Sequence, residues 1–466
     1  MIKLPRRQFL HVATTALIAS PYVARAQTTR TGLPLRRSTR DRLEEALARI
    51  TDPKGEGSRA CLTVYSEAAR AAADAADARA LAGIMLGPLD GAIVSIKDLF
   101  DVAGEPTRAG SKVLAAAPPA AADAPVVRRL RAAGSIIVAK TNMTEFAFSI
   151  LGINPHYGTP GNPADRTRVP GGSSSGGAVA VADGMCEIAI GSDTGGSVRA
   201  PAAFCGIVGF KPSKFRIPTE GAFPLSYTLD SIGPMARTVA DCAAADTVLA
   251  GKDNWRLEAE PLGGLRLGIP QGRPLADLDR VVGARFSDAI NRLGQARVQL
   301  SDEQLPQLDE MAKVSAKAAI TNIEAYAIHR ELLAAHAADY DPFVRGRLEA
   351  GRDISAADYI ALMRARAALV REMDARLSDL DGLVLPTTPI VAPTIAEVSA
   401  SFEAFMAKQL LGFRNTSMIN FFDLCAVSLP LPSEGGLPVG LMLVARNGQD
   451  RKLLRMAAAV EHLFSA

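Results

Sequence analysis

The chain has 466 residues, more than the roughly 250 to 300 at which a single hydrophobic core usually stops growing. We therefore expect either two domains or one unusually large layered domain. Hydrophobic residues make up 48% and charged residues 22% of the sequence, which is the balance of an ordinary globular enzyme and excludes a disordered or fibrous chain.

Residues 1–26 have the pattern of an export signal. Arg6 and Arg7 precede an apolar run at 12–23, and Ala24-Arg25-Ala26 offers a small-x-small cleavage site. A membrane-spanning helix is disfavoured because this run is well short of the roughly 20 apolar residues that cross a bilayer. We interpret the segment as a twin-arginine signal, which predicts a periplasmic or secreted protein with a mature chain of residues 27–466.

The positive charge of the chain belongs to this signal. Residues 1–26 hold four basic residues and no acid, so their removal changes the net charge from +3 to −1. The mature chain therefore lacks the excess positive charge that would favour binding to nucleic acid or anionic lipid. We expect no nucleic-acid partner and no stable membrane insertion after the signal is removed.

The cysteines show neither a disulfide framework nor metal-ligand spacing. The five are scattered in mostly apolar surroundings at Cys61, Cys186, Cys205, Cys242 and Cys425. An odd number cannot pair fully within one chain, so buried thiols are the favoured interpretation. No cluster of histidine, cysteine and carboxylate residues has ligand spacing, and we predict no metal and no cofactor.

After the signal, helices and strands are expected to alternate. The patterns predict helices at 36–50, 62–81 and 125–133, the start of a helix at 142–148, and strands at 92–96 and 135–139. This βαβ rhythm indicates an α/β fold. Lys97 follows the first of these strands, a position where catalytic side chains often lie, although a lone lysine there is more often a surface side chain.

Two clusters rich in serine and glycine follow, at 171–177 and 191–199. An apolar segment at 178–190 joins them and fits a helix that leads into a buried strand. Glycine lets the backbone approach a ligand closely, so consecutive N–H groups can converge on one oxygen. A flexible linker would lack these apolar flanks. A phosphate-binding loop would end in Gly-Lys-Ser or Gly-Lys-Thr, and neither cluster does.

The second half continues the alternation. Helices are expected at 239–249 and 281–293 and strands at 265–269, 383–386 and 439–444, with a final helix from residue 453. Between residues 311 and 371 the pattern is mostly helical.

These motifs resemble the amidase signature family, which has a serine-rich Gly-Gly-Ser-Ser-Gly-Gly-type block, a Gly-Ser-Asp-Thr-Gly-Gly-Ser-Ile/Val-Arg block and a lysine after a short apolar strand. The chain offers 171–177, 191–199 and Lys97. The resemblance runs from about residue 83 to the C-terminus. It implies one large α/β/α sandwich, a mixed central sheet covered by helices on both faces. The helical region 306–378 resembles the part where family members vary most, so its apolar residues would form part of the substrate pocket.

The resemblance also implies a role for each site residue. Ser197 would be the nucleophile, Ser173 a proton relay held by a cis peptide after Gly172, and Lys97 a base that begins neutral. The backbone N–H groups of Thr194, Gly195, Gly196 and Ser197 would form the oxyanion hole, with Gly172, Ser174, Asp193 and Arg199 as supporting residues. Burial would have to lower the pKa of Lys97 from its ordinary value of about 10.4. The four histidines beyond the signal, at 156, 329, 336 and 462, are not needed.

The expected function is an exported amidase that cleaves small amides, aryl amides or carbamates through an acyl-enzyme on Ser197 and acts as a possible homodimer. Residues 420–426 resemble the variant found in allophanate-hydrolase-like and indoleacetamide-hydrolase-like branches, since Asp423 and Cys425 stand where many members have Gly and Pro. One alternative is an ammonia-releasing amidotransferase subunit, which resembles this chain but acts in the cytosol on charged tRNA. Another is a solute-binding protein that uses the fold without turnover.

Overall fold

A computed structural model of the protein describes residues 37–251, 256–432 and 436–465. Residues Thr39–Ala466 form one compact unit. The predicted export signal, residues 1–26, lies outside the described residues. The mature domain was predicted to begin at residue 27, and the compact unit begins at Thr39.

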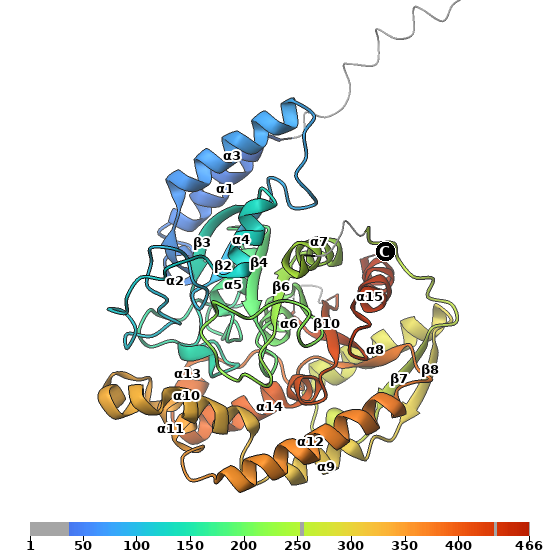
Figure 1. The fold of residues 1–466 in the computed structure, drawn as a ribbon. Helices are drawn as coiled ribbons and strands as arrows, with labels where there is room; N and C mark the ends of the chain where they lie inside the picture. The colour runs from blue at the N-terminus through green and yellow to red at the C-terminus, as the bar shows by residue number, and fades with distance from the viewer. Residues whose placement is uncertain (1–36, 252–255, 433–435, 466) are drawn as a thin grey trace, which may run out of the picture. The chain divides into compact units, whose positions relative to one another are not determined.

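One mixed sheet organises this unit, as predicted (Figure 1). The described residues hold eleven strands in the order β1-β3-β2-β4-β6-β5-β10-β11-β9-β7-β8. Strand β2 runs parallel to both its neighbours, β3 and β4, whereas β10 is antiparallel to both of its own. The strands are β1 Cys61–Val64, β2 Ile93–Lys97, β3 Ile136–Thr141, β4 Ile188–Ser192, β5 Val208–Lys211, β6 Ile232–Ala236, β7 Arg266–Pro270, β8 Gln299–Glu303, β9 Gly382–Pro386, β10 Cys425–Pro430 and β11 Gly440–Ala445.

Helices occupy most of the connections between these strands. The α-helices of the described residues are α1 Thr39–Thr51, α2 Gly57–Ala60, α3 Ser66–Leu81, α4 Pro125–Ala132, α5 Ser175–Ala182, α6 Arg199–Cys205, α7 Val239–Ala250, α8 Arg280–Gln295, α9 Gln307–Val314, α10 Ile320–His336, α11 Pro342–Glu349, α12 Ala356–Arg376, α13 Ile395–Ser399, α14 Phe402–Phe421 and α15 Asp450–Ser465. Short 3₁₀ turns are η1 Glu145–Ala147, η2 Arg273–Leu275 and η3 Ala337–Asp339.

Helices cover both faces of the sheet because its strands are apolar on both sides. In β2, Ile93 packs into a core with α1, α3 and α5. Its neighbour Val94 points the other way, into a core shared with α4, α7 and α15. The side chains of β9 and β11 alternate in the same way. In β9, Leu383 packs into a core with α12 and α14, whereas Val384 packs into the core shared with α8 and α15. This alternation of side chains is the basis of the three-layer α/β/α arrangement.

Two of the predicted elements need correction. The helix predicted at 62–81 begins only at Ser66, because residues 61–64 form the edge strand β1, which pairs with β3. The helix predicted to start at 142–148 is only the 3₁₀ turn η1, since Phe146 and Ala147 have φ angles of 51° and 59°, in the left-handed region that no α-helix adopts. The predicted ranges also left out β5, β6, β8 and β10.

The region 306–378 is helical, as predicted, and contains α9 to α12. Helix α12 packs with α9 and α14 over one end of the sheet, where Leu362, Leu369 and Met373 join buried residues of β9, β10 and β11. All five cysteines are buried free thiols, which confirms that prediction. Among the described helices, none is long and apolar enough to cross a bilayer.

Candidate active site

The ends of two parallel strands bring a lysine and a serine together. Strands β2 and β4 are paired so that Ile96 lies opposite Ile190. Because both strands run in the same direction, their next residues emerge at the same edge of the sheet. There Lys97 Nζ lies 2.9 Å from Ser192 Oγ. The structure therefore confirms the prediction that Lys97 lies at the end of a strand.

Lys97 is withdrawn from solvent, with an exposed fraction of 0%. Its Nζ also lies 2.7 Å from Ser173 Oγ. Burial disfavours the ammonium form and lowers the pKa of Lys97 to about 7, although the carboxylates of Asp193 and Asp230 act in the opposite direction. The side chain is therefore a neutral amine in much of the population near neutral pH, and it contacts two hydroxyl groups.

Ser173 stands just before helix α5, in a tightly packed turn. The Gly172–Ser173 peptide bond is cis, as the resemblance implied. A Cβ atom at Gly172 would come within 2.7 Å of Gly152 N and 2.8 Å of Thr144 Oγ1, closer than real contacts allow. Glycine is thus required here to let the backbone of residues 152 and 172 approach each other. The Ser174 N–H donates to Ser197 O at 3.3 Å, which ties the two serine clusters together.

The loop between β4 and α6 is organised by the carboxylate of Asp193. It accepts hydrogen bonds from the Gly196 N–H at 2.9 Å and the Val198 N–H at 3.1 Å. Arg199, which has no exposed surface, forms a two-point ion pair with it through Nε at 3.0 Å and Nη2 at 2.8 Å. Asn420 Nδ2 donates both to Asp193 Oδ1 and to Asp193 O. These contacts fix the backbone of residues 193–199.

Burial alone would raise the pKa of Asp193. The charge and hydrogen bonds of Arg199, with smaller contributions from Lys211 and Asn420, outweigh this effect and hold the pKa well below its usual range. Asp193 is therefore ionised at every pH at which the protein would be assayed. The loop remains held by a charged pair that is shielded from solvent.

Three of the four expected oxyanion donors are free. Within the described parts of the chain, the backbone N–H groups of Thr194, Gly195 and Ser197 donate to no protein acceptor. The fourth prediction needs correction, because the Gly196 N–H is taken by Asp193. Gly196 is required for another reason: its φ is 129°, and a Cβ atom there would lie 2.1 Å from Thr416 Oγ1. The loop thus presents free N–H groups on both sides of Gly196.

A cavity of about 350 Å³ opens beside this loop. Ser192 and Thr194 line it, together with the loop 219–225 and Tyr227. Asp230 also lines it and accepts from Thr194 Oγ1 at 2.5 Å and from the backbone N–H groups of Leu225 and Ser226. Burial raises the pKa of Asp230, and these hydrogen bonds oppose the rise. Asp230 thereby connects the far wall of the cavity to the first residue of the loop that carries the free N–H groups.

The histidines have other partners. His156 Nε2 contacts Glu145 at 2.8 Å, and His329 Nδ1 contacts the Tyr340 hydroxyl at 3.1 Å. Burial lowers the pKa of His329 to about 4. Among the described residues, no group of three or more His, Cys, Asp or Glu side chains could hold a metal ion.

Sequence reasoning assigned no role to the side chains of Ser192, Asp230 or Asn420, although residues 221–226 and 229–234 resemble loops that cross near the site in family members. Ser192 belongs to the quoted motif 191–199, and its place in a strand parallel to β2 was the available signal. Asp230 and Asn420 are 37 and 227 residues from Asp193, and no local pattern links them to it. Only the tertiary fold brings them to the loop: Asp230 lies just before β6, the sheet neighbour of β4, and Asn420 lies on α14, which contacts α6.

Comparison with known proteins identifies the family of the chain. Residues 41–454 match the profile of the family described as Amidase. The chain belongs to the amidase signature family. It is a hydrolase that acts on amide C–N bonds, and an amide is its substrate.

Relatives with different activities lie at similar distances within this family. The chain is 36% identical to the 2-amino-5-chloromuconic acid deaminase of Comamonas testosteroni, over 85% of this chain and 86% of that protein. It is 33% identical to AtzE, a 1-carboxybiuret hydrolase component of Pseudomonas sp. strain ADP, over 91% and 95%. It is 35% identical to a glutamyl-tRNA(Gln) amidotransferase subunit of Anaeromyxobacter dehalogenans, over 91% and 92%.

Solved structures share the fold over nearly the whole chain. A crystal structure described as an amidase superposes with a TM-score of 0.82 at 35% identity, covering 92% of this chain and 97% of that one. The peptide amidase of Stenotrophomonas maltophilia superposes with a TM-score of 0.78 at 29% identity, covering 92% and 94%.

Proposed function

We propose that the chain hydrolyses small amides, aryl amides or carbamates through an acyl-enzyme on Ser197, with Ser173 and Lys97 as the proton relay. The observation that carries this proposal is the buried Lys97 amine, whose Nζ lies 2.7 Å from Ser173 Oγ. With its pKa lowered to about 7 by burial, this amine can accept a proton near neutral pH.

In the proposed acylation, Lys97 takes the proton of Ser173 while Ser173 takes that of Ser197. Ser197 Oγ then forms a bond to the carbonyl carbon of the substrate, and the negative charge develops on the carbonyl oxygen. The free N–H groups of Thr194, Gly195 and Ser197 are suited to stabilise that charge. The proton returns through the relay to the leaving nitrogen as the C–N bond breaks. Water releases the acid by the same relay.

Ser197→Ala tests the proposal. The variant should keep its fold by circular dichroism but lose turnover of a primary amide to the background level, because losing one hydroxyl leaves the loop hydrogen bonds in place. A fluorophosphonate probe should label the wild-type protein at Ser197 and fail to label the variant. Ser175→Ala is a matched control in the neighbouring serine cluster and should retain labelling. Substantial turnover by Ser197→Ala would refute the nucleophile assignment.

Amidotransferase chemistry is the second candidate, because relatives of that kind match at 35% identity over 92% of their length. It predicts ammonia release from glutamine only in the presence of partner subunits. The proposed amidase acts alone or as a homodimer on small amides, so the two are separated by assaying the purified chain with glutamine and with a panel of primary amides, anilides and aryl carbamates. Ligand binding without release of ammonia, aniline or phenol would instead favour the solute-binding alternative. The branch suggested by Asp423 and Cys425 stays a prediction.

Export by the twin-arginine route also stays part of the proposal. It rests on Arg6, Arg7, the apolar run and the small-x-small site. Replacing both arginines by lysine should leave the protein in the cytoplasmic fraction at its precursor size, whereas the natural sequence should yield a shorter periplasmic or secreted form. If the natural and the lysine-substituted proteins were distributed in the same way between the fractions, the export proposal would be wrong, and the amidase proposal would be unaffected.

A further inference from the structure

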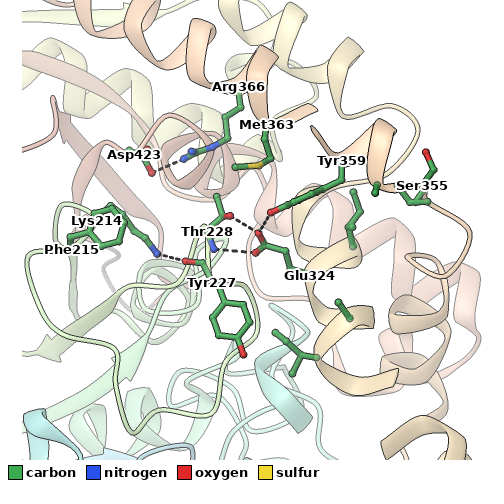
Figure 2. Close-up of a pocket in the computed structure, with 15 residues that line it drawn as sticks. Lys214, Phe215, Tyr227, Thr228, Glu324, Ser355, Tyr359, Met363, Arg366 and Asp423 are labelled. Carbon is green, nitrogen blue, oxygen red and sulfur yellow. Dashed lines mark hydrogen bonds and ion pairs between the residues drawn. The ribbon is translucent and has the colours of Figure 1, made fainter. Parts of the chain in front are cut away.

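The structure contains a second, larger cavity of about 830 Å³, whose lining residues are drawn in Figure 2. Its walls come from the segment Lys214–Phe215, the loop at Tyr227–Thr228, and helices α10 and α12. None of Lys97, Ser173 and Ser197 lines it. Tyr227 lines both this cavity and the smaller one that contains Thr194. The two cavities therefore share one lining residue. Lys97, Ser173 and Ser197 do not line the smaller cavity either, but Ser192, which contacts Lys97, and Thr194, whose backbone N–H is free, do. The larger cavity thus adjoins a cavity lined by neighbours of the proposed catalytic residues.

The walls of the larger cavity are mainly apolar. They include Phe215, Ile323, Ala327, Ile328, Ile354 and Met363. Phe215 and Tyr227, at the rim, are 88% and 70% exposed. The backbone of Phe215 has a φ of 66°, a value uncommon for a bulky residue. An apolar, concave surface of this size next to a reaction site is typical of ligand-binding pockets.

Each charged side chain that lines the cavity has at least one partner, and among their buried atoms only Arg366 Nε has none within the described residues. Arg366, 8% exposed, pairs with Asp423 at 2.6 Å. Glu324 accepts hydrogen bonds from Ser226, Thr228 and the Tyr359 hydroxyl, as the dashed lines to Thr228 and Tyr359 show in Figure 2.

Lys214, the remaining charged residue of the lining, is held by backbone carbonyl groups of the loop that carries Tyr227. Its Nζ donates to the backbone carbonyls of Tyr227 and Asp230 at 2.9 and 2.8 Å. These polar groups thus fix the walls of the cavity. Because a charged ligand group would have to be desolvated against residues that are already paired, an uncharged apolar group is favoured.

From these observations we infer that the larger cavity receives an uncharged aryl or branched-alkyl group attached to the scissile amide, with Tyr227 as the wall between that group and the reacting carbonyl. This inference rests on the proposed amidase function and names the substrate class of the same site. It assigns specificity to α10 and α12, which do not supply Lys97, Ser173 or Ser197.

The test compares small and bulky neutral amides. One series varies the acyl group, from acetamide through butyramide and hexanamide to 3-phenylpropanamide, and a second varies the amine of acetamides, from ammonia to aniline. In at least one series, kcat/KM of the wild-type protein should rise with apolar size, by up to about fourfold per methylene. No dependence on size in either series would overturn the inference while leaving the amidase proposal intact.

Ala327→Trp then fills the cavity from α10. The variant should lose at least tenfold in kcat/KM for the best bulky substrate and less than twofold for acetamide. Ala335 is an exposed alanine near the end of the same helix and does not line the cavity. Ala335→Trp is therefore the matched control and should change neither value. Equal losses for large and small amides in Ala327→Trp would contradict a role in specificity.

A binding measurement separates this inference from the catalytic proposal. The neutral fluorophore N-phenyl-1-naphthylamine should bind to Ser197→Ala protein and be displaced by 3-phenylpropanamide, and the additional Ala327→Trp change should weaken its binding at least tenfold. This readout does not depend on turnover. If the fluorophore bound equally well after Ala327→Trp, or did not bind at all, the larger cavity would not be the apolar site.

Discussion

The two cavities that share Tyr227 are walled by different parts of the chain. The smaller one lies where β4 ends, beside the loop 193–199, whose backbone is held by the buried pair of Asp193 and Arg199. The larger one lies among α10, α12 and an exposed aromatic rim, with apolar walls. Chemistry needs atoms fixed to within fractions of an ångström, whereas selection of an apolar group needs only a surface of suitable shape. We therefore expect reaction and specificity to be carried by separate elements, so most substitutions should affect one or the other; the contact between Glu324 and the loop of Asp230 is the point where the two are linked.

The largest effect should come from Lys97→Arg. Arginine stays protonated and cannot act as a base, so acylation should slow by about 10²- to 10⁴-fold for small and bulky amides alike. Single-turnover acylation measures this rate, and circular dichroism checks the fold. If the variant retained more than about a tenth of the wild-type rate, a barrier change below ~1.4 kcal/mol, Lys97 would not be the base.

Lys211→Arg is the matched control for this experiment. Lys211 is equally buried, and burial lowers its pKa to about 8, but its Nζ donates to the carbonyls of Pro212 and Leu424 rather than to hydroxyls. A backbone carbonyl has no proton that the Lys211 amine could accept, so Lys211 cannot act as a base toward these partners. We expect the acylation rate of Lys211→Arg to stay within about tenfold of wild type, a change in barrier under ~1.4 kcal/mol. The substitution should instead lower the thermal stability of the protein.

A smaller effect is expected for Asp193→Asn, which tests whether the buried ion pair holds the loop beside the smaller cavity. The change leaves the Arg199 guanidinium buried without its carboxylate, which should lower the free energy of unfolding by about 3 to 5 kcal/mol. Urea denaturation measures the loss. The exposed carboxylate of Asp374 lies 3.3 Å from the guanidinium of the half-buried Arg446. Asp374→Asn is therefore a surface control and should cost less than ~1 kcal/mol. Similar values for both variants would show that the buried pair does not organise the loop.

The smallest effect tests whether the two cavities communicate. Glu324 on α10 holds the loop that carries Asp230, and Asp230 holds Thr194. Glu324→Gln places an amide N–H₂ where donors now point, so kcat should fall by roughly tenfold through the disturbed loop. Glu331→Gln, on the same helix and exposed, is the control and should be neutral. An unchanged kcat in Glu324→Gln would mean that the larger cavity affects binding only.

Much of this arrangement could be predicted from the sequence because the motifs that determine it are contiguous in the chain. The motifs 171–177 and 191–199 and the strand before Lys97 are contiguous runs, so the α/β class, the helical region and the position of Lys97 follow from pattern and resemblance. The edge strand β1 was wrongly assigned to a helix because residues 61–64 form a run too short to show a period. The contact of Asp193 with Asn420 could not be predicted, because Asn420 lies on α14 and is brought to Asp193 by helix packing rather than by spacing in the sequence. The same holds for Tyr227, whose place between the cavities depends on helices about a hundred residues later.

The central claim is that Lys97 starts each acylation as a neutral amine, and the pH dependence of single-turnover acylation tests it most directly. Because burial lowers its pKa to about 7, the neutral form is lost as the pH falls through that value. The rate should then drop tenfold per pH unit below about pH 6 and level off above about pH 8, as expected for one group titrating near 7. The Lys97→Arg variant should lack this acid limb. A wild-type rate that keeps rising toward pH 10, or an acid limb that survives in Lys97→Arg, would contradict the account.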